Sequence, residues 1–302
     1  MKIELIGNIF NEKNYLLNQR THFSVPCADF IENDIYQIYF SSRDLNNRSQ
    51  TYSFRVDINN PFNILDISSE PVLSTGRLGN FDEHGSMSTW IYTNENLDKK
   101  YMYYIGWNTA STVPFRNSIG LAIDSGKGFQ KYSEGPILDR GIYDPCFVAS
   151  CCIVDIEDYF KMWYLSCDKW EKVDGTLTHY YNIKSAISTD LINWKRDGHV
   201  AIDFKNKNEY AISRPSVLFE DGIYKMWYSF RGESYDIGYA ESEDGHTWER
   251  KDELFRVPRS NLNWDSDMIE YPNVFKHKNQ KYLLYNGNDY GKTGIGLALI
   301  HD

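Results

Sequence analysis

Acidic side chains recur just before the strand-like runs of this 302-residue sequence. Two carboxylates on opposite sides of one pocket can cleave a glycosidic bond, because one protonates the leaving oxygen while the other acts as base or nucleophile. Burial and mutual repulsion would raise one pKa and leave the other group ionised. The alternative is that each acid caps a turn or carries a solvated charge. We predict four catalytic carboxylates in these segments: Asp144, Glu270, Asp82 and Glu83.

Cationic side chains in and near the same segments point to an anionic ligand. An Arg guanidinium binds a carboxylate or phosphate through two parallel hydrogen bonds. Arg214 is therefore predicted to hold an acidic sugar, a sugar phosphate or a nucleotide-linked sugar. The alternative is that Arg214 neutralises a nearby acid as a buried structural ion pair. The further candidate substrate-binding residues of this kind are His84, Arg116, Arg231 and His22.

Polar loops that contain Gly follow the same strand in three parts of the chain. They lie at 106–108, 229–232 and 286–288. Because ligand-binding residues concentrate on loops carried by a rigid scaffold, we expect these loops to form one rim of a pocket. Trp107 and Asn108 are predicted to stack on a sugar face and to bind its hydroxyl groups, and Tyr271 is a further candidate. The alternative for Trp107 is a loop aromatic that covers neighbouring strands.

A five-fold repeat must position these segments. Two aromatic residues three positions apart recur inside strand-like runs, and the first members are 65, 59, 64 and 58 residues apart. Such a period indicates a fold built from similar units. A second run follows each copy, and four of these runs carry a small Ala that fits a crowded position between sheets: Ala122, Ala186, Ala240 and Ala298. The aromatic pairs are Tyr36 and Tyr39, Tyr101 and Tyr104, Phe160 and Trp163, Tyr224 and Trp227, and Tyr282 and Tyr285.

Each repeat contains about four short strand-like runs, and helical periodicity is absent over any long window. Short strands at an even spacing indicate radial repetition, which leaves few exposed sheet edges. We therefore predict an all-β fold, a five-bladed β-propeller with about four antiparallel strands in each blade, as one domain over residues 1–302. The 20 N-terminal residues are expected to supply a strand to the last blade. The alternative is a β-sandwich.

Composition restricts the partners. The chain has 32 Lys and Arg against 42 Asp and Glu, a formal net charge of −10, so a nucleic-acid-binding surface is not expected. No apolar run approaches the roughly 18 to 20 residues of a membrane span, and the N-terminus lacks the pattern of a secretory signal. The five Cys have no zinc spacing and are expected to be reduced thiols. We predict a cytoplasmic protein whose oligomeric state is open.

Motifs of several other enzyme classes are absent. The sequence has no P-loop, no GxSxG elbow, no HExxH motif and no EF-hand loop. We therefore predict no metal in the active site and no cofactor, although the acids leave a structural Ca²⁺ at the propeller axis open. The expected partner is a small sugar or an oligosaccharide.

Several short motifs together resemble a known superfamily. They are Tyr143-Asp144-Pro145, Glu270-Tyr271-Pro272, and the S-x-D-x-x-x-W turns at 188–194 and 242–248. On these motifs the chain is similar to the five-bladed propeller glycosidases of glycoside hydrolase families 43, 62, 32, 68 and 130. The stretches 81–85, 113–123, 143–150 and 264–275 look more closely like an uncharacterised bacterial group associated with surface-polysaccharide gene clusters.

The resemblance implies site roles and also shows departures. It implies that Asp144 is the residue that stabilises the transition state and that Glu270 is the acid. Those hydrolases carry an Asp on the first blade, whereas the corresponding stretch here, 22–26, has none. In families 32 and 68 the acid Glu belongs to the fourth blade, whereas here that blade has Arg214 and the Glu lies in the fifth.

Three functions remain open at this stage. The first is an enzyme that acts on a glycosidic bond of a bacterial glycan through paired carboxylates in the central pocket. The second is an enzyme of surface-polysaccharide precursor synthesis that acts on a phosphorylated or nucleotide-linked sugar. The third is a sugar-binding propeller without catalysis, since fold alone does not give function. The charge of the pocket separates the first two, because acids favour a neutral sugar whereas Arg residues favour an acidic ligand.

Overall fold

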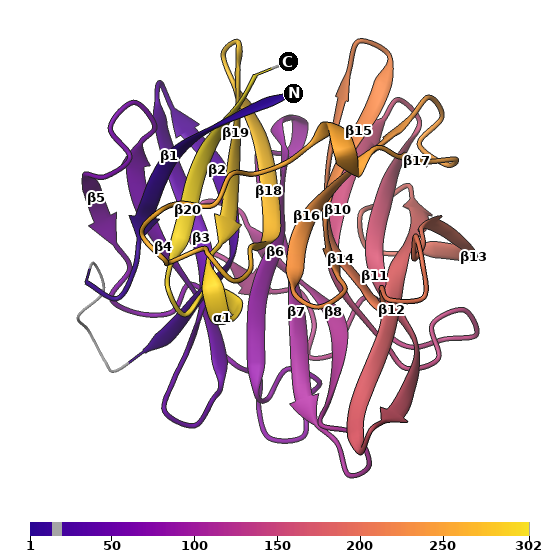
Figure 1. The fold of residues 1–302 in the computed structure, drawn as a ribbon. Helices are drawn as coiled ribbons and strands as arrows, with labels where there is room; N and C mark the ends of the chain where they lie inside the picture. Colours follow the sequence, from indigo (N-terminus) through magenta and orange to yellow (C-terminus); the bar gives the residue numbers. More distant parts are fainter. Residues whose placement is uncertain (14–19, 302) are drawn as a thin grey trace.

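The computed structural model describes residues 1–13 and 20–301, and this part of the chain is built almost entirely from strands (Figure 1). The strands follow one another in groups of four. Group one is β2 (Thr21–Glu32), β3 (Ile35–Arg43), β4 (Ser49–Asp57) and β5 (Ile64–Ile67). Group two is β6 (Gly85–Asn94), β7 (Lys99–Thr109), β8 (Phe115–Asp124) and β9 (Gln130–Lys131). The predicted all-β fold class is therefore confirmed.

The later groups continue the order. Group three is β10 (Phe147–Ile156), β11 (Tyr159–Val173), β12 (Thr176–Ser188) and β13 (Lys195–Ile202). Group four is β14 (Ala211–Glu220), β15 (Ile223–Arg231), β16 (Tyr235–Ser242) and β17 (Glu249–Arg250). Group five is β18 (Glu270–His277), β19 (Gln280–Asn286), β20 (Ile295–His301) and the N-terminal β1 (Lys2–Phe10). Three short helical segments are η1 (Glu95–Leu97), η2 (Asp252–Leu254) and α1 (Asn288–Gly291).

Strands within each group pair antiparallel with their neighbours. Single parallel bridges, Ser49 with Gly85 and Tyr181 with Ala211, join groups one and two and groups three and four. The described strands thus form two mixed eight-stranded sheets and one four-stranded sheet rather than five separate blades. The first strands of successive groups contact one another, and β18 contacts β2 as well as β14.

The N-terminal strand pairs with the last strand of the chain, as the sequence predicts. β1 runs antiparallel to β20 from Lys2, opposite His301, to Phe10, opposite Ile295. Figure 1 shows the two ends of the chain close together beside these strands. Of the 20 N-terminal residues assigned to this strand, 14–19 lie outside the described residues.

The small Ala of each repeat packs against the preceding group. Ala122, Ala240 and Ala298 are completely buried and Ala186 is nearly so. Ala240 of group four lies in one apolar cluster with Trp163 of group three, and Ala298 of group five lies in one with Trp227 of group four. A larger side chain would displace these rings, which explains why the repeat keeps Ala between neighbouring groups.

Each first strand contains an irregularity in its pairing with the second strand. The register shifts lie between Ser24 and Cys27, Ser88 and Trp90, Val148 and Cys151, Ser213 and Ser216, and Glu270 and Asn273. A bulge re-aims the side chains around it. In three of these strands the residue before a Pro has a left-handed backbone, with φ of 54° at Val25, 52° at Arg214 and 56° at Tyr271. Non-glycine residues rarely adopt this conformation, which is frequent at functional sites.

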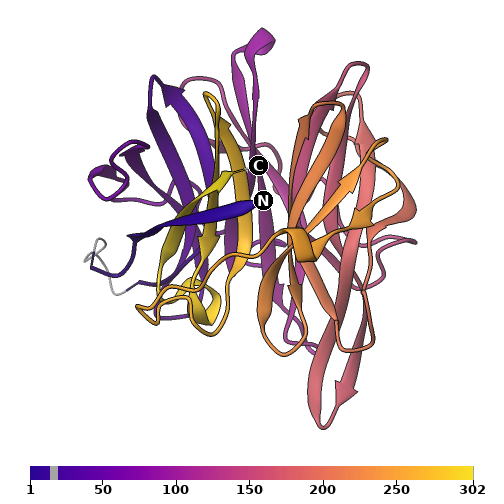
Figure 2. The ribbon, with the colours of Figure 1, turned by 45° about the horizontal axis from the view of Figure 1, so that its top comes forward.

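The hairpin of β11 and β12 is longer than its neighbours. Pairing continues to Val173 opposite Thr176, and Figure 2 shows the hairpin extending beyond the adjacent strands. In the described part of the chain, helices long and apolar enough to cross a membrane are not found.

Candidate functional site

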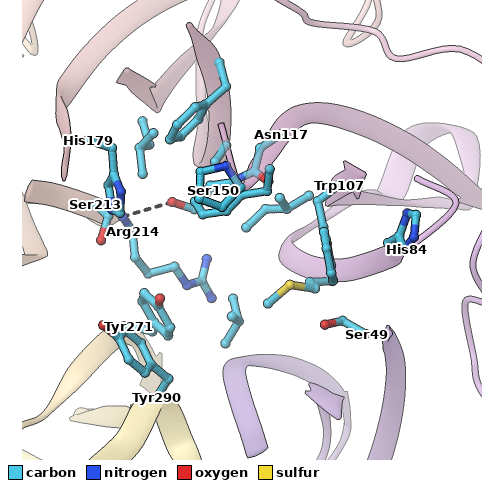
Figure 3. A pocket seen from close by; sticks show the side chains of 18 of the residues that line it. Ser49, His84, Trp107, Asn117, Ser150, His179, Ser213, Arg214, Tyr271 and Tyr290 are labelled. Carbon is cyan, nitrogen blue, oxygen red and sulfur yellow. Dashed lines mark hydrogen bonds between the residues drawn. The ribbon is translucent and has the colours of Figure 1, made fainter. Parts of the chain in front are cut away.

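A cavity of about 660 Å³ opens where the bulged strands meet. This volume lies within the roughly 300 to 1,000 Å³ typical of small-molecule sites. Polar side chains from several groups reach it (Figure 3). The polar and aromatic residues that line it are Arg43, Asn46, Asn47, Ser49, His84, Trp107, Thr109, Phe115, Asn117, Phe147, Ser150, His179, Tyr181, Ser213, Arg214, Tyr235, Tyr271 and Tyr290.

Four of the predicted binding residues line this cavity: His84, Trp107, Arg214 and Tyr271. The rings of His84 and Trp107 lie 5.6 Å apart between centroids, and the His84 amide donates to the Trp107 carbonyl at 3.1 Å. A side chain at Gly85 would place its Cβ 1.8 Å from the Trp107 Nε1. Glycine at position 85 therefore allows the indole to lie over the backbone at the mouth of β6.

Arg214 lies in the middle of the cavity wall, between Ser213 and Tyr271 in Figure 3. Its side chain is completely buried, and its guanidinium donates to the carbonyl oxygens of Thr89 on β6 and Pro26 on β2. Its backbone amide donates to the Ser150 hydroxyl of β10 at 3.0 Å. Arg214 thus ties four groups together.

The alternative that Arg214 forms a buried ion pair with an acid is not found among the described residues, because its hydrogen-bond partners there are neutral. Burial lowers the pKa of the guanidinium, although its usual value is so high that the group stays charged at neutral pH. The floor of the cavity therefore carries a positive charge without a carboxylate counter-ion among these partners.

The register of β7 and β8 decides which loop residues face the cavity. Trp107 pairs with Asn117, whereas Asn108 pairs with Arg116. Trp107 and Asn117 line the cavity, while Asn108 and Arg116 are not among its lining residues, and Arg116 is exposed. Neighbouring residues of a strand point to opposite faces. The prediction thus selected Asn108 and Arg116, one position away from the pair that reaches the cavity, and it missed Asn117.

Asp82 and Asp144 are completely or almost completely buried, but neither lines the cavity. Asp82 accepts from the Tyr104 hydroxyl at 3.1 Å and pairs with the Lys131 ammonium at 2.5 Å. Asp144 accepts from the Tyr164 hydroxyl at 3.1 Å and pairs with the Arg196 guanidinium at 2.7 Å. Both carboxylates are therefore held by a tyrosine and a cation of their own group.

The same arrangement recurs in the later groups. Asp265 accepts from Tyr285 at 3.2 Å, and Asp252 accepts from Tyr228 at 2.6 Å. Arg250 pairs with Asp252 at 2.9 Å and with Glu209 at 2.7 Å. We call these sets the acid–tyrosine clamps: Asp82 with Tyr104 and Lys131, Asp144 with Tyr164 and Arg196, Asp252 with Tyr228 and Arg250, and Asp265 with Tyr285. Their recurrence explains the acids at one level of the repeat and favours a structural role for Asp82 and Asp144.

The remaining predicted residues lie near the cavity without lining it. Glu83 accepts from the Gly79 amide at 2.7 Å, and one of its oxygens is 3.7 Å from the His84 Nδ1. The His22 Nδ1 contacts the Thr21 hydroxyl at 2.8 Å, and burial, with the positive charge of Arg43, lowers the pKa of His22 to about 4. His22 is therefore neutral at pH 7.

Arg231 supports the cavity from behind two lining tyrosines. It donates to the Tyr290 hydroxyl at 2.8 Å, and its guanidinium lies 5.2 Å from the centre of the Tyr235 ring. Both tyrosines line the cavity, whereas Arg231 is not among its lining residues.

Glu270 differs from the clamped acids. It is completely buried, and neither carboxylate oxygen has a hydrogen-bond partner among the described residues. Burial raises the pKa of Glu270 well above its usual value, and the charges of Arg231 and Arg43, together with the nearby Tyr271 side chain, only partly oppose this. It interacts electrostatically with Tyr271 and Tyr235, which line the cavity. Glu270 is therefore a buried carboxyl with a raised pKa adjacent to the cavity wall.

Several lining residues were missed from the sequence. Arg43, Asn46, Asn47 and Ser49 come from the end of β3, the turn after it and the start of β4. Arg43 follows the aromatic pair of its repeat at the same distance as Arg231 follows that of group four. The rule that selected the later polar loops would therefore have found Arg43 in the first copy. The position of His179 and Tyr181 at the cavity depends on the length of the β11–β12 hairpin, which no sequence pattern indicated.

The charge of the cavity is the property that separated the possible functions. Among the described lining residues there are two Arg and two His, and none is Asp or Glu. Paired carboxylates facing each other across the cavity are therefore not present in this part of the structure. The lining favours an anionic ligand over a neutral one.

Comparison with known proteins places the chain in a family. No known family profile matches it. The uncharacterized proteins Rv1502 and MT1551, from two strains of Mycobacterium tuberculosis, are each 39% identical over 301 residues, which cover 98% of this chain and 98% of each relative. This similarity extends over nearly the whole length of both proteins.

Solved structures share the fold at low sequence identity. A glycoside hydrolase matches with a TM-score of 0.75 and 17% identity, over 99% of this chain and 92% of its own. A thermostable family-43 glycoside hydrolase matches with a TM-score of 0.68 and 17% identity, over 95% of this chain and 92% of its own. The β-1,2-mannobiose phosphorylase of Listeria innocua, in complex with β-1,2-mannobiose, matches with a TM-score of 0.72 and 9% identity, over 99% of this chain and 97% of its own. The chain thus shares its fold with these carbohydrate-active proteins, and it belongs to the family of the uncharacterized Mycobacterium tuberculosis protein Rv1502.

Proposed function

We propose that this protein is a carbohydrate-active enzyme that acts on an anionic saccharide in the central cavity of a five-bladed β-propeller. The five groups of four strands and the contacts between successive first strands, including β18 with β2, support the propeller. The likeness to glycoside hydrolases and to a glycoside phosphorylase supports a carbohydrate substrate.

One observation carries the choice of an anionic substrate: the described cavity lining contains Arg43 and Arg214 and no carboxylate. A guanidinium in a partly dry cavity attracts phosphate or carboxylate more strongly than it does in water. Trp107 and Asn117 lie on paired strands at the same cavity and would bind the sugar face and its hydroxyl groups.

Glu270 is the proposed proton donor. A general acid must hold its proton near the working pH, and the buried carboxyl of Glu270 does so because its ionised form is poorly solvated. A buried carboxyl without hydrogen bonds costs stability, so it needs an explanation other than folding. As the glycosidic carbon–oxygen bond breaks, Glu270 would give its proton to the leaving oxygen at the wall formed by Tyr271 and Tyr235, while a water molecule adds to the anomeric carbon and releases its own proton to solvent.

The test compares ligands and then one variant. Isothermal titration calorimetry of the full chain with glucose 1-phosphate, glucuronic acid and neutral disaccharides is expected to show binding of the anionic compounds only. Tight binding of a neutral disaccharide with none of the anions would contradict the proposal. For any compound turned over, Glu270→Gln is expected to reduce kcat by at least about 100-fold, the lower end of what general acids contribute. Glu249→Gln, which changes an exposed acid, is the matched control.

A second candidate is a binding protein without turnover. The absence of a second carboxylate among the described lining residues favours it, since glycoside cleavage ordinarily uses two. It predicts binding of anionic sugars that Glu270→Gln leaves unchanged, together with no product from any compound that binds.

A further inference from the structure

The cavity has two chemically different ends. At one end the lining is polar and comes from β3, the turn after it, β4 and β6: Arg43, Asn46, Asn47, Ser49 and His84. The Asp44 carboxylate, the acid of this turn, accepts from the backbone amides of Asn46 and Arg48 at 2.9 Å each. It also accepts from the Arg48 guanidinium at 2.9 Å. The only acid of the turn is thus occupied by its own turn. The Arg43 guanidinium donates to the Asn47 amide oxygen at 3.4 Å, and its other N–H groups lie at the cavity without a carboxylate of this turn as partner.

At the other end the lining is aromatic. Phe115, Phe147, His179 and Tyr181 lie here on β8, β10 and β12, and Trp170 packs behind them. The His179 and Tyr181 rings are stacked, with centroids 4.9 Å apart and planes within 12°. Trp170 lies 5.3 Å from Phe115 and 4.9 Å from His179. The long β11–β12 hairpin brings these rings together.

His179 acts at this end as an aromatic surface rather than a cation. Burial, with the charge of Arg231, lowers the pKa of His179 to about 4, so the imidazole is neutral at pH 7. Its Nδ1 has no hydrogen-bond partner among the described residues. A flat neutral ring with a free edge nitrogen suits a planar heterocycle that both stacks and accepts or donates one hydrogen bond.

Arg214 lies between the two ends. Figure 3 shows His179 on one side of the cavity, Ser49 and His84 on the other, and Arg214 between them. The buried guanidinium contributes positive charge at the middle of the cavity, and its hydrogen-bond partners among the described residues are neutral. A ligand that matches this order has a planar ring, then negative charge, then a polar group rich in hydroxyls.

From this order we infer that the cavity binds a nucleoside diphosphate-linked sugar. The base stacks on the aromatic end, the diphosphate lies over Arg214 toward Arg43, and the sugar meets Trp107, Asn117 and His84. Stacking of a base on aromatic side chains strengthens binding without requiring a particular base. This inference rests on the proposed function, because it names the substrate class of the same cavity.

Calorimetry with the full chain separates the parts of the ligand. The probes are inorganic pyrophosphate, glucose 1-phosphate, UDP, GDP, UDP-glucose and GDP-mannose. We expect at least one nucleotide-sugar to bind 10-fold or more tightly than either pyrophosphate or glucose 1-phosphate. Binding of glucose 1-phosphate as tightly as the nucleotide-sugars would overturn the inference and keep the proposed function. If neither these six anionic probes nor glucuronic acid binds, both are overturned.

A variant of the aromatic end tests the position of the base. Phe115→Ala is expected to weaken nucleotide-sugar binding roughly 5- to 100-fold, the range for loss of one base–aromatic contact, and to leave glucose 1-phosphate within two-fold. His179→Ala is the second variant if Phe115→Ala does not fold. Tyr132→Ala, which removes an exposed ring outside the lining, is the control. If Phe115→Ala lowers the affinity for both ligands equally, or for neither, the placement of the base is contradicted.

Discussion

The acid–tyrosine clamps recur from group to group, whereas the charged residues of the cavity wall are collected from several groups. The clamps recur in four of the five groups, each from residues of its own group. The cavity wall takes Arg43 from one group, His84 and Trp107 from the next, and His179 and Arg214 from others, and Arg43 has a counterpart at the same repeat position in Arg231 of group four. The recurring clamps therefore follow the repeat of the fold, whereas the cavity wall combines residues from several groups.

The clamps also explain a second feature of the repeat. The Gly of the second strand-like run lies under the clamp tyrosine in three groups. A Cβ at Gly120 would come within 2.2 Å of the Tyr104 ring, and a Cβ at Gly238 within 2.6 Å of the Tyr228 ring. Acid, tyrosine and glycine are thus one packing unit. The buried acids have their partners, while Glu270 at the cavity has none among the described residues.

Arg214 lines the cavity and also ties four groups together, so its removal should have the largest effect. Arg214→Ala deletes hydrogen bonds to two buried carbonyl groups and leaves a cavity, so we expect unfolding to become easier by about 4 kcal/mol. Urea denaturation of the variant measures this. A loss below about 1 kcal/mol with abolished ligand binding would show that Arg214 serves the ligand alone.

Breaking one clamp should destabilise the protein without affecting the site. Asp144→Asn removes the buried partner of Arg196, and we expect a loss of about 3 kcal/mol in the free energy of unfolding. Ligand affinity of the folded variant should equal that of the wild type. Asp158→Asn, in an exposed turn, is the control. An unchanged melting temperature with lost turnover would instead assign Asp144 to catalysis.

Glu270 should make stability depend on pH in the direction opposite to an ordinary ion-paired acid. Its folded pKa is raised above its unfolded value, so the unfolded state releases its proton first as pH rises. Stability is then lost as pH rises above about 4.5, at up to about 1.4 kcal/mol per pH unit. Glu270→Gln should remove this dependence and be more stable than wild type at pH 8. A parallel pH dependence of wild type and variant would contradict the raised pKa.

The smallest expected effect is on ligand affinity, and it should separate the two faces of the pair formed by β7 and β8. Asn117→Ala should weaken binding of the anionic sugar about five-fold, the value of one hydrogen bond of about 1 kcal/mol. Asn108→Ala, on the opposite face, should leave affinity unchanged. Titration calorimetry of the two variants decides whether the register places Asn117 at the ligand. Equal losses would show that both faces contribute.

Much of the fold could be predicted because it depends on patterns that repeat. The spacing of the aromatic pairs predicts the five groups, and the small Ala residues predict the close contact between groups, which the structure confirms. Four of the predicted binding residues, His84, Trp107, Arg214 and Tyr271, line the cavity, because they stand next to the strands that the repeat defines.

The rest of the site could not be predicted, because it depends on which side chain of a strand faces inward. Asn108 and Asn117 have the same side chain, and only the pairing of β7 with β8 separates them. The acids of the repeat looked catalytic because the sequence does not show that Tyr104 and Tyr164 hold them. A strand changes face at every residue, so a small error in register exchanges core for cavity.

The sequence by itself thus determined the all-β class, the number of repeated groups and the residue types at their ends. These follow from local propensity and spacing, which act along the chain. The tertiary structure decided that the cavity is cationic and aromatic, that the clamped acids lie outside it, and that Glu270 stays unpaired among the described residues. The physical reason lies in the bulges of the first strands. Each bulge interrupts the alternation of side chains between the two faces of a strand, which is the pattern from which a sequence predicts the buried face.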